Sequence, residues 1–125
     1  MRHCIIALLL ILVRCGTAED LDIARLKLPT GFRLEIFAQA PHARMMAFTP
    51  GGVLLVTATT DGKVLALPDS KHSSRAERTV TVLDNLNAPH GIAVHKGKLY
   101  VAETHQLQRY DWDESQLRAT NGQVI

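Results

Sequence analysis

Two basic side chains, Arg44 and His90, stand 46 residues apart, each at the beginning of one of two similar apolar segments. An arginine guanidinium can bind a carboxylate through two parallel hydrogen bonds. A histidine ring has a pKa near neutrality, so it can donate a hydrogen bond or act as a base. If the two segments are equivalent parts of one fold, Arg44 and His90 are predicted to face the same ligand.

Three histidines could be taken for a metal site, because His90, His95 and His105 follow one another at short spacing. Residues five apart on a strand point to opposite faces, so His90 and His95 cannot converge on one ion. We therefore predict no metal site. Glu103 ends an apolar run, and a lone carboxylate is weak evidence for Ca²⁺, which takes six or more oxygen ligands. We interpret Glu103 as a solvated strand end rather than a Ca²⁺ or sugar ligand.

A group of acidic residues, Asp111, Asp113 and Glu114, surrounds Trp112. We interpret it as a solvated acidic loop rather than a catalytic pair of carboxylates. The sequence contains no phosphate-binding glycine loop, no nucleophile elbow and no paired-cysteine motif. No catalytic residue can be assigned from these patterns.

The elements that position these residues come from a repeat, because residues 46–57 and 92–103 both contain an apolar strand, a glycine turn and a second apolar strand. Equivalent residues lie 46 positions apart in the first strand, 45 in the second and 43 in the third, where Val64 and Leu67 match Leu107 and Tyr110. Every length change falls in a turn, where insertions are tolerated, and none in a strand, where a slip would turn the buried face outward. Repetition every 40–45 residues or so is typical of β-propeller blades.

We therefore expect an all-β fold, with a first blade at about 41–84 and a second, incomplete blade at about 88–125. Strands are expected near 43–49, 53–58, 63–67, 79–83, 90–95, 98–103 and 106–111, with a further strand beginning at 122–125. Residues 113–118 are expected to form a helical turn. Alternating apolar and charged residues at 32–37 predict the outer strand that completes the last blade of a closed ring.

The first 18 residues predict export, because a positive start is followed by an apolar run from Cys4 to Val13 and by small residues up to Ala18. This is the pattern of a secretory signal peptide cleaved after Ala18, so the protein is expected to be periplasmic or secreted. The apolar run is too short for a stable membrane span. Both cysteines lie in this segment.

Residues 19–125 contain 12 basic and 12 acidic residues, and this balance argues against a nucleic-acid partner. They are too few to close a propeller, which needs at least about four blades. We therefore expect the chain to be the N-terminal part of a larger propeller, with uncovered sheet faces that lower its solubility.

The sequence resembles the pyrroloquinoline-quinone (PQQ)-dependent glucose/sorbosone dehydrogenase family, closest to its L-sorbosone dehydrogenase branch. The resemblance covers roughly residues 26–111 and is carried by the segments Leu26–Ala38, Ala43–Ala47, Asp61–Asp69, Leu86–Val94 and Leu99–Glu103. It implies a six-bladed propeller that holds the quinone and a Ca²⁺ ion at the mouth of its central channel. It also implies a histidine base on a later inner strand than those present here, so the catalytic centre is expected beyond Ile125.

On this resemblance, Arg44 and His90 are the candidate cofactor-binding residues, and Arg44 would pair with a carboxylate of the quinone. The family usually has asparagine at the position of His90, so we favour a hydrogen-bonding role for this histidine over catalysis. The resulting hypothesis is an exported sugar or aldehyde dehydrogenase that passes electrons through PQQ to an acceptor, with this fragment inactive alone. A non-catalytic propeller that presents a binding surface is the alternative, and a propeller lactonase or other hydrolase is a third reading.

Overall fold

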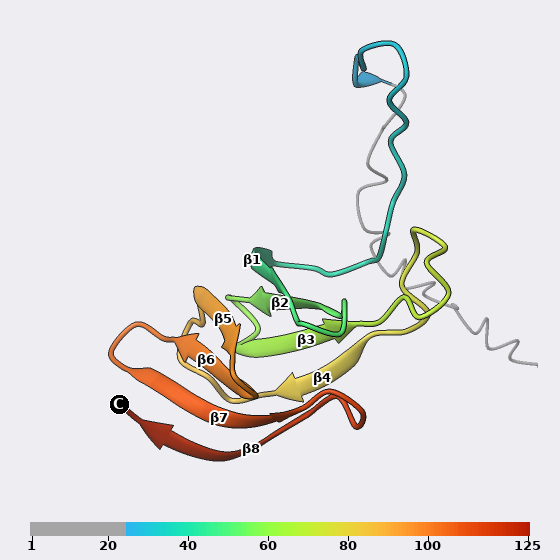
Figure 1. The fold of residues 1–125 in the computed structure, drawn as a ribbon. Coiled ribbons are helices and arrows are strands. Elements are labelled where there is room, and N and C mark those ends of the chain that lie inside the picture. Colours follow the sequence, from blue (N-terminus) through green and yellow to red (C-terminus); the bar gives the residue numbers. More distant parts are fainter. Residues whose placement is uncertain (1–24) are drawn as a thin grey trace, which may run out of the picture. The chain divides into compact units, whose positions relative to one another are not determined.

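The computed structural model describes residues 25–125, and among these residues it contains eight β-strands and no α-helix (Figure 1). The chain divides into two compact units between Leu34 and Glu35, and all eight strands belong to the second unit. The strands are β1 (Ala43–Phe48), β2 (Leu54–Ala58), β3 (Lys63–Leu67), β4 (Val80–Leu83), β5 (Gly91–His95), β6 (Lys98–Ala102), β7 (Leu107–Asp113) and β8 (Arg118–Val124). The predicted all-β fold is confirmed.

The strands form two antiparallel sheets in which each strand pairs with the next one along the chain. The first sheet has the order β1-β2-β3-β4 and the second the order β5-β6-β7-β8. A four-stranded meander of this kind is the form of a propeller blade. The signal peptide predicted at residues 1–18 lies outside the described residues. Within residues 25–125, no helix has the length and apolar character needed to cross a membrane.

The hydrogen-bond register of the two sheets confirms the repeat offsets. Phe48 pairs with Leu54 in the first sheet, and Val94 pairs with Leu99 in the second, which reproduces the offsets of 46 and 45. Leu54 then pairs with Leu67, and Leu99 pairs with Tyr110, which reproduces the offset of 43. The two sheets are therefore equivalent strand by strand, and their length differences lie in the turns.

The core lies between the sheets, where aliphatic side chains of both are buried together. The first sheet contributes Leu55, Val64 and Ala66, and the second contributes Leu99 and Val101, each 0% exposed. Because side chains alternate along a strand, each sheet uses one face for this contact and turns the other away. The sheets thus pack face to face, as consecutive blades of a propeller do.

The face of the second sheet that points away from this core differs sharply from the equivalent face of the first sheet, which packs in the core. On the second sheet that face, which we call the outer face, carries Lys98, Tyr100, Arg109, Asp111 and Gln123, and these residues are cross-strand neighbours. The register makes Tyr100 equivalent to Leu55 and Arg109 equivalent to Ala66 of the first sheet. Polar residues therefore stand where the first sheet uses aliphatic ones to pack against its neighbour.

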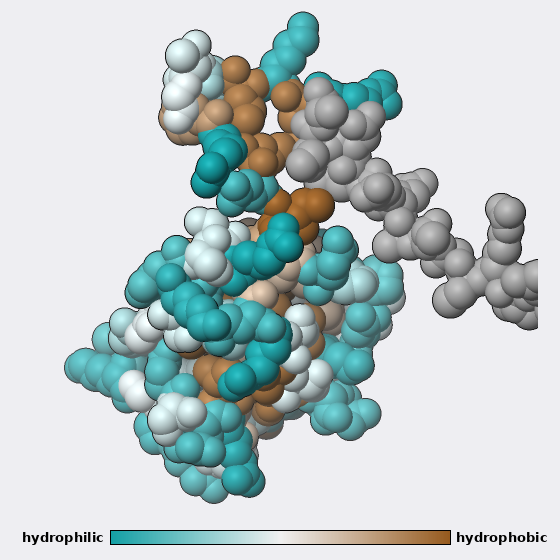
Figure 2. Space-filling model, turned by 90° about the vertical axis from the view of Figure 1, so that its right-hand side faces the viewer, coloured by the Kyte–Doolittle hydropathy of each residue, from teal (hydrophilic) through white to brown (hydrophobic). Residues whose placement is uncertain are grey.

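Large apolar side chains reach the surface elsewhere, and brown hydrophobic patches are visible among hydrophilic side chains in Figure 2. Three of the exposed large apolar side chains lie on β1, where Met45, Met46 and Phe48 are 47%, 64% and 69% exposed. The residues equivalent to Met46 and Phe48 in the second sheet are Ile92 and Val94, which pack against the core. Within the described residues, the expected uncovered sheet face is therefore present only at β1, because Val56, Leu65 and Leu67 on the same face of the first sheet are buried. Low solubility stays a prediction.

Two local expectations were wrong. Residues 32–37 form no strand, and the carbonyl of Phe37 instead accepts a hydrogen bond from the amide of Ala76 at 2.9 Å. A strand needs a neighbour along its whole edge, and β1 to β8 pair only within the two sheets. The helical turn expected at residues 113–118 is also absent. Residues 114–117 instead form the hairpin turn between β7 and β8, so the fourth strand of the second sheet begins at Arg118 rather than at residue 122.

Candidate functional site

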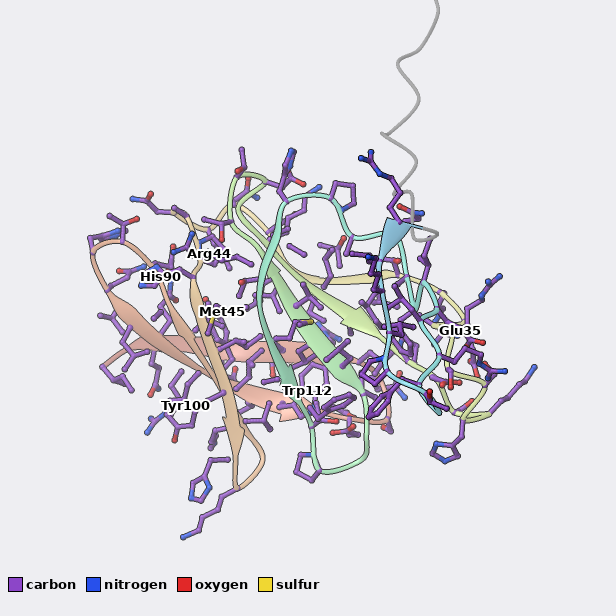
Figure 3. The ribbon with its side chains drawn as sticks, turned by 90° about the horizontal axis from the view of Figure 1, so that it is seen from above. Glu35, Arg44, Met45, His90, Tyr100 and Trp112 are labelled. Carbon is purple, nitrogen blue, oxygen red and sulfur yellow. The ribbon has the colours of Figure 1, made fainter. Side chains whose placement is uncertain are left out.

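The starts of β1 and β5 lie at the same end of the two sheets, and one threonine joins them. The Thr59 amide donates a hydrogen bond to the His42 carbonyl at 3.2 Å, just before β1. The Thr59 hydroxyl donates to the Pro89 carbonyl at 2.7 Å, just before β5. We use the term rim for the residues at this end: His42, Arg44, Thr59, Asp61 and His90. Figure 3 shows Arg44 and His90 at the ends of these neighbouring strands.

The backbone reaches both strand starts in the same way. His42 has a φ of 58° and Ala88 a φ of 48°, and these left-handed residues stand at equivalent positions, 46 apart. Each precedes the candidate side chain by two residues. A left-handed conformation is unfavourable for a residue with a Cβ atom, so the surrounding contacts must impose it. Arg44 and His90 are thus equivalent in the sequence repeat and are also preceded by the same left-handed backbone conformation.

Arg44 lies in a β-bulge, which the sequence did not predict. Ala43 pairs with Ala58 and Met46 with Val56, so β1 has one residue more than β2 over this interval. A bulge bends its strand and changes the direction of its side chains, and bulges are frequent next to functional sites. The side chain of Arg44 is exposed, and it makes no ion pair or hydrogen bond with the described residues.

His90 enters a strand of regular register. Its amide donates to the Ala102 carbonyl at 2.9 Å, and its ring nitrogen Nδ1 lies 3.2 Å from the Ala88 carbonyl. The next residue is Gly91, where a Cβ atom would come within 2.9 Å of the Ala102 side chain. The close packing of Gly91 on Ala102 explains why a glycine follows His90. The ring of His90 is exposed, with its second nitrogen available for a ligand.

Glu103 is not the solvated strand end that we expected, because it is only 6% exposed. Its carboxylate accepts hydrogen bonds from the Asn87 amide, from the Gln106 side chain at 2.8 Å and from the Gln108 side chain at 2.6 Å. The Tyr110 hydroxyl extends this network by donating to Gln108 at 2.8 Å. Burial alone would raise the pKa of Glu103, but these hydrogen bonds outweigh it, and the net direction is down. Glu103 therefore anchors the turn that leads to His90.

The rim contains a pair that sequence reasoning missed. The His42 ring nitrogen Nδ1 lies 2.8 Å from the Asp61 carboxylate, and both side chains are partly exposed, at 54% and 38%. Asp61 stands before Gly62 in the turn between β2 and β3, and an Asp-Gly pair by itself indicates only a hairpin turn. His42 could have been found by the repeat, since it stands two residues before Arg44 as Ala88 does before His90. His42 thus stands two residues before Arg44, while its carboxylate partner Asp61 lies in the turn between β2 and β3.

The acidic residues around Trp112 do not form a solvated loop, which corrects a second interpretation. Asp111 lies within β7, pairs with Lys98 and accepts a hydrogen bond from Asn121 at 2.7 Å. The Asn121 hydrogen bond is the main cause that lowers the pKa of Asp111, followed by Lys98.

Glu114 joins the two sheets. It accepts hydrogen bonds from the Thr49 hydroxyl of the β1–β2 turn and from the Trp112 ring at 2.8 Å. The Thr49 side chain is itself buried. Asp113 caps the following turn by accepting from Ser115 at 2.7 Å and from the Gln116 amide at 3.1 Å. These acids are structural links rather than a reactive pair.

Two further histidines, His95 and His105, make no hydrogen bond or ion pair with the rim side chains. His105 bonds to the side chain of Asn87 at 3.1 Å, and His95 is exposed at the end of β5. Within the described part of the chain, no three His, Cys, Asp or Glu side chains gather as metal ligands would. The exposed cation of Arg44 and the ring of His90 suit an anionic ligand such as a carboxylated quinone. The same residues do not supply the oxygen ligands that Ca²⁺ requires.

No family model and no curated protein matches this chain. Among solved structures, it is similar to the holo form of the pyranose dehydrogenase PQQ domain from Coprinopsis cinerea, with a TM-score of 0.59 and 20% identity over 68% of this chain and 21% of that chain. It is also similar to the iodide structure of a Trichoderma reesei protein of Carbohydrate-Active Enzymes Family AA12, with a TM-score of 0.60 and 18% identity over 73% of this chain and 25% of that one. The calcium structure from the same organism and family has a TM-score of 0.56 and 20% identity, over 67% of this chain and 22% of that one.

The chain thus spans about a fifth to a quarter of the length of these structures. At this level of identity the likeness shows the fold alone. The two sheets of this chain are two blades of a partial β-propeller, built like part of these larger proteins.

Proposed function

We propose that this chain provides the first two blades of an exported PQQ-dependent dehydrogenase that oxidises a sugar or an aldehyde. In this proposal Arg44 and His90 form one side of the quinone site. The catalytic residues lie in blades that this chain does not contain, so the chain binds the cofactor weakly and is inactive alone. The resemblance of the sequence to the glucose/sorbosone dehydrogenases and the likeness of the fold to a PQQ domain support this assignment.

The observation that carries the proposal is the pairing of two exposed basic side chains at one rim. Arg44 is the second residue of β1 and His90 directly precedes β5, and Thr59 holds the segments before both strands together through hydrogen bonds of 3.2 and 2.7 Å. Neither basic side chain is neutralised by a carboxylate of the described residues. Arg44 can attract a small anion, because its unpaired guanidinium gains charge-assisted hydrogen bonds from it.

The roles of the two residues follow from their donor chemistry. Arg44 can hold a carboxylate of the ligand with two parallel N–H donors, which fixes both position and orientation. His90 can donate a hydrogen bond from Nε2 only when its ring is protonated on both nitrogens, because Nδ1 already donates to the Ala88 carbonyl. When bound, the quinone supplies a two-electron acceptor for hydride from the substrate carbon, and a dye or a natural acceptor reoxidises it.

Titration of the chain with PQQ, followed by absorbance or by quenching of Trp112 fluorescence, tests the cofactor assignment. Arg44→Gln is expected to weaken binding about tenfold or more, since a hydrogen bond to a charged group contributes about 1.5–3 kcal/mol. Arg118→Gln is the matched control, because Arg118 is an exposed arginine on β8. Binding that is absent in the wild type, or equal in both variants, would overturn the quinone site.

A second assay separates the enzyme from a non-catalytic binding module. The chain is incubated with PQQ, Ca²⁺, a panel of aldoses and aldehydes, and a dye acceptor. Dye reduction is expected to be absent for the chain alone. The same assay on a longer product of the gene, containing the following blades, is expected to show sugar-dependent dye reduction. Failure of that longer protein across the panel would favour the binding module.

A further inference from the structure

We propose that Thr57 is a positioning residue for Arg44. In this proposal its buried hydroxyl holds the β1 bulge in the shape that directs the Arg44 side chain to the rim. The proposal rests on the proposed function for the identity of the ligand, a carboxylated quinone. The part concerning the direction of Arg44 can be tested without any ligand.

The contact between Thr57 and the bulge is specific. Between the Ala43–Ala58 and Met46–Val56 pairs, Arg44 and Met45 on β1 stand opposite Thr57 alone on β2. The Met45 amide donates to the Thr57 hydroxyl at 3.1 Å, and that hydroxyl can donate back to the Met45 carbonyl at 3.5 Å. One side chain thus serves the donor and the acceptor of the extra residue, which a bulge leaves without ladder partners.

Burial makes this contact consequential. Thr57 is 0% exposed, while the other buried residues of β2 are Leu55, Val56 and Ala58. A buried hydroxyl among aliphatic side chains is unfavourable unless it is hydrogen-bonded. The bulge supplies the hydrogen-bond partners of the Thr57 hydroxyl. The hydroxyl in turn supplies the partner of the Met45 amide and can donate to the Met45 carbonyl. A valine here would match the shape of threonine but leave the Met45 amide without its partner.

The second sheet shows what happens without this hydroxyl. Its residue equivalent to Thr57 is Ala102, which pairs with Gly91 in a ladder that runs without a register shift. The bulge and the hydroxyl therefore occur together in the first sheet and are both missing from the second. Arg44 therefore lies in a bulge beside a threonine hydroxyl, whereas its equivalent, His90, precedes a strand of regular register.

The experiment compares Thr57→Val with Thr57→Ser, which restores the hydroxyl. In Thr57→Val, exchange of the Met45 amide hydrogen is expected to rise about tenfold, and the Arg44 side-chain Nε resonance to shift. Thr57→Ser is expected to keep both values near those of the wild type. Unchanged exchange and an unchanged Arg44 resonance in Thr57→Val would overturn the proposal without reference to PQQ. A Thr57→Val variant that does not fold would be replaced by Thr57→Ala, which resembles the second sheet.

A double-mutant cycle with PQQ tests the functional consequence. Thr57→Val is expected to weaken PQQ binding several-fold in the wild-type background and to have no further effect in the Arg44→Gln background. Equal effects in the two backgrounds would refute a role through Arg44. Absence of PQQ binding by the wild-type chain would refute the proposed function, while the exchange and resonance measurements would still decide the role of Thr57.

Discussion

Replacing Glu103 by glutamine is the sharpest test of the buried network behind the rim. The carboxylate accepts three hydrogen bonds, one from the Asn87 amide on Oε2 and two from Gln106 and Gln108 on Oε1. Glutamine keeps the size of the side chain but has only one acceptor oxygen. If that oxygen keeps the two glutamine donors, the new amide group meets the Asn87 N–H, and two donors face each other.

The magnitude follows from the hydrogen bonds that are lost or weakened. A buried donor left without an acceptor costs about 1–3 kcal/mol, and hydrogen bonds to a charged group are stronger than neutral ones. Because Glu103 is 6% exposed, water can replace little of this loss. We expect Glu103→Gln to lower the free energy of unfolding by about 2–4 kcal/mol, out of a total on the order of 5–15 kcal/mol.

The pH dependence gives a second, independent check. The pKa of Glu103 in the folded chain is lower than its ordinary value of 4.5. Its contribution to stability is therefore complete above that value and is lost as the pH falls through the folded pKa. The difference in stability between wild type and Glu103→Gln should be constant at neutral pH and shrink on acidification below 4.5.

Urea unfolding followed by Trp112 fluorescence, at neutral and acidic pH, measures both effects. Glu77→Gln is the control, because Glu77 also has a lowered pKa, chiefly through Ser70, but is exposed in the loop between β3 and β4. It should change stability little at either pH. A Glu103→Gln variant within about 0.5 kcal/mol of the wild type, or a difference that persists unchanged in acid, would refute the reasoning.

Two further substitutions test the turns that shape the rim, both by urea unfolding. Gly62→Ala is expected to destabilise the chain by about 2 kcal/mol or more, because Gly62 has a φ of +63° and an added Cβ would come within 2.5 Å of the Leu86 carbonyl oxygen; a neutral result would contradict the packing of that turn. Ala88→Gly is expected to stabilise it by about 0.5–1 kcal/mol, because Ala88 holds a φ of 48° that glycine adopts without strain. A loss of stability in that variant would show that the methyl group of Ala88 contributes more than its backbone strain costs.

The sequence predicted the architecture well, because the repeat constrains it twice. A strand boundary inferred in one copy had to agree with the other. The offsets of 46, 45 and 43 reappear when the paired residues Phe48, Leu54 and Leu67 are compared with Val94, Leu99 and Tyr110. Residues 32–37 have no second copy in the chain, and there the alternation of residue types was misleading. Alternation describes which side chains can face a core, but it cannot supply a neighbouring strand.

The local chemistry of the site could not be predicted, since it depends on contacts across the sheets. The environment of Glu103 is set by Asn87, 16 residues earlier, together with two glutamines that look unremarkable in sequence. The bulge at Arg44 depends on a threonine 12 residues away from Met45. Glu114 finds its partner Thr49 across 65 residues. Carboxylates that appear solvated in sequence are thus buried or bridging once long-range partners are known.

The contrast between the two sheet faces limits how these blades can be recombined. The first sheet meets its neighbour with Leu55 and Ala66, whereas the equivalent positions of the second sheet are Tyr100 and Arg109. Arg109 already bonds to Gln123 at 2.7 Å, and Lys98 to Asp111. A copy of the second blade placed after itself would bury the Arg109 guanidinium against Leu99 and Val101, with only the neutral Gln123 side chain to accept from its charge. The two blades have one shape but are not interchangeable modules, and their order along the chain is fixed by the chemistry of their faces.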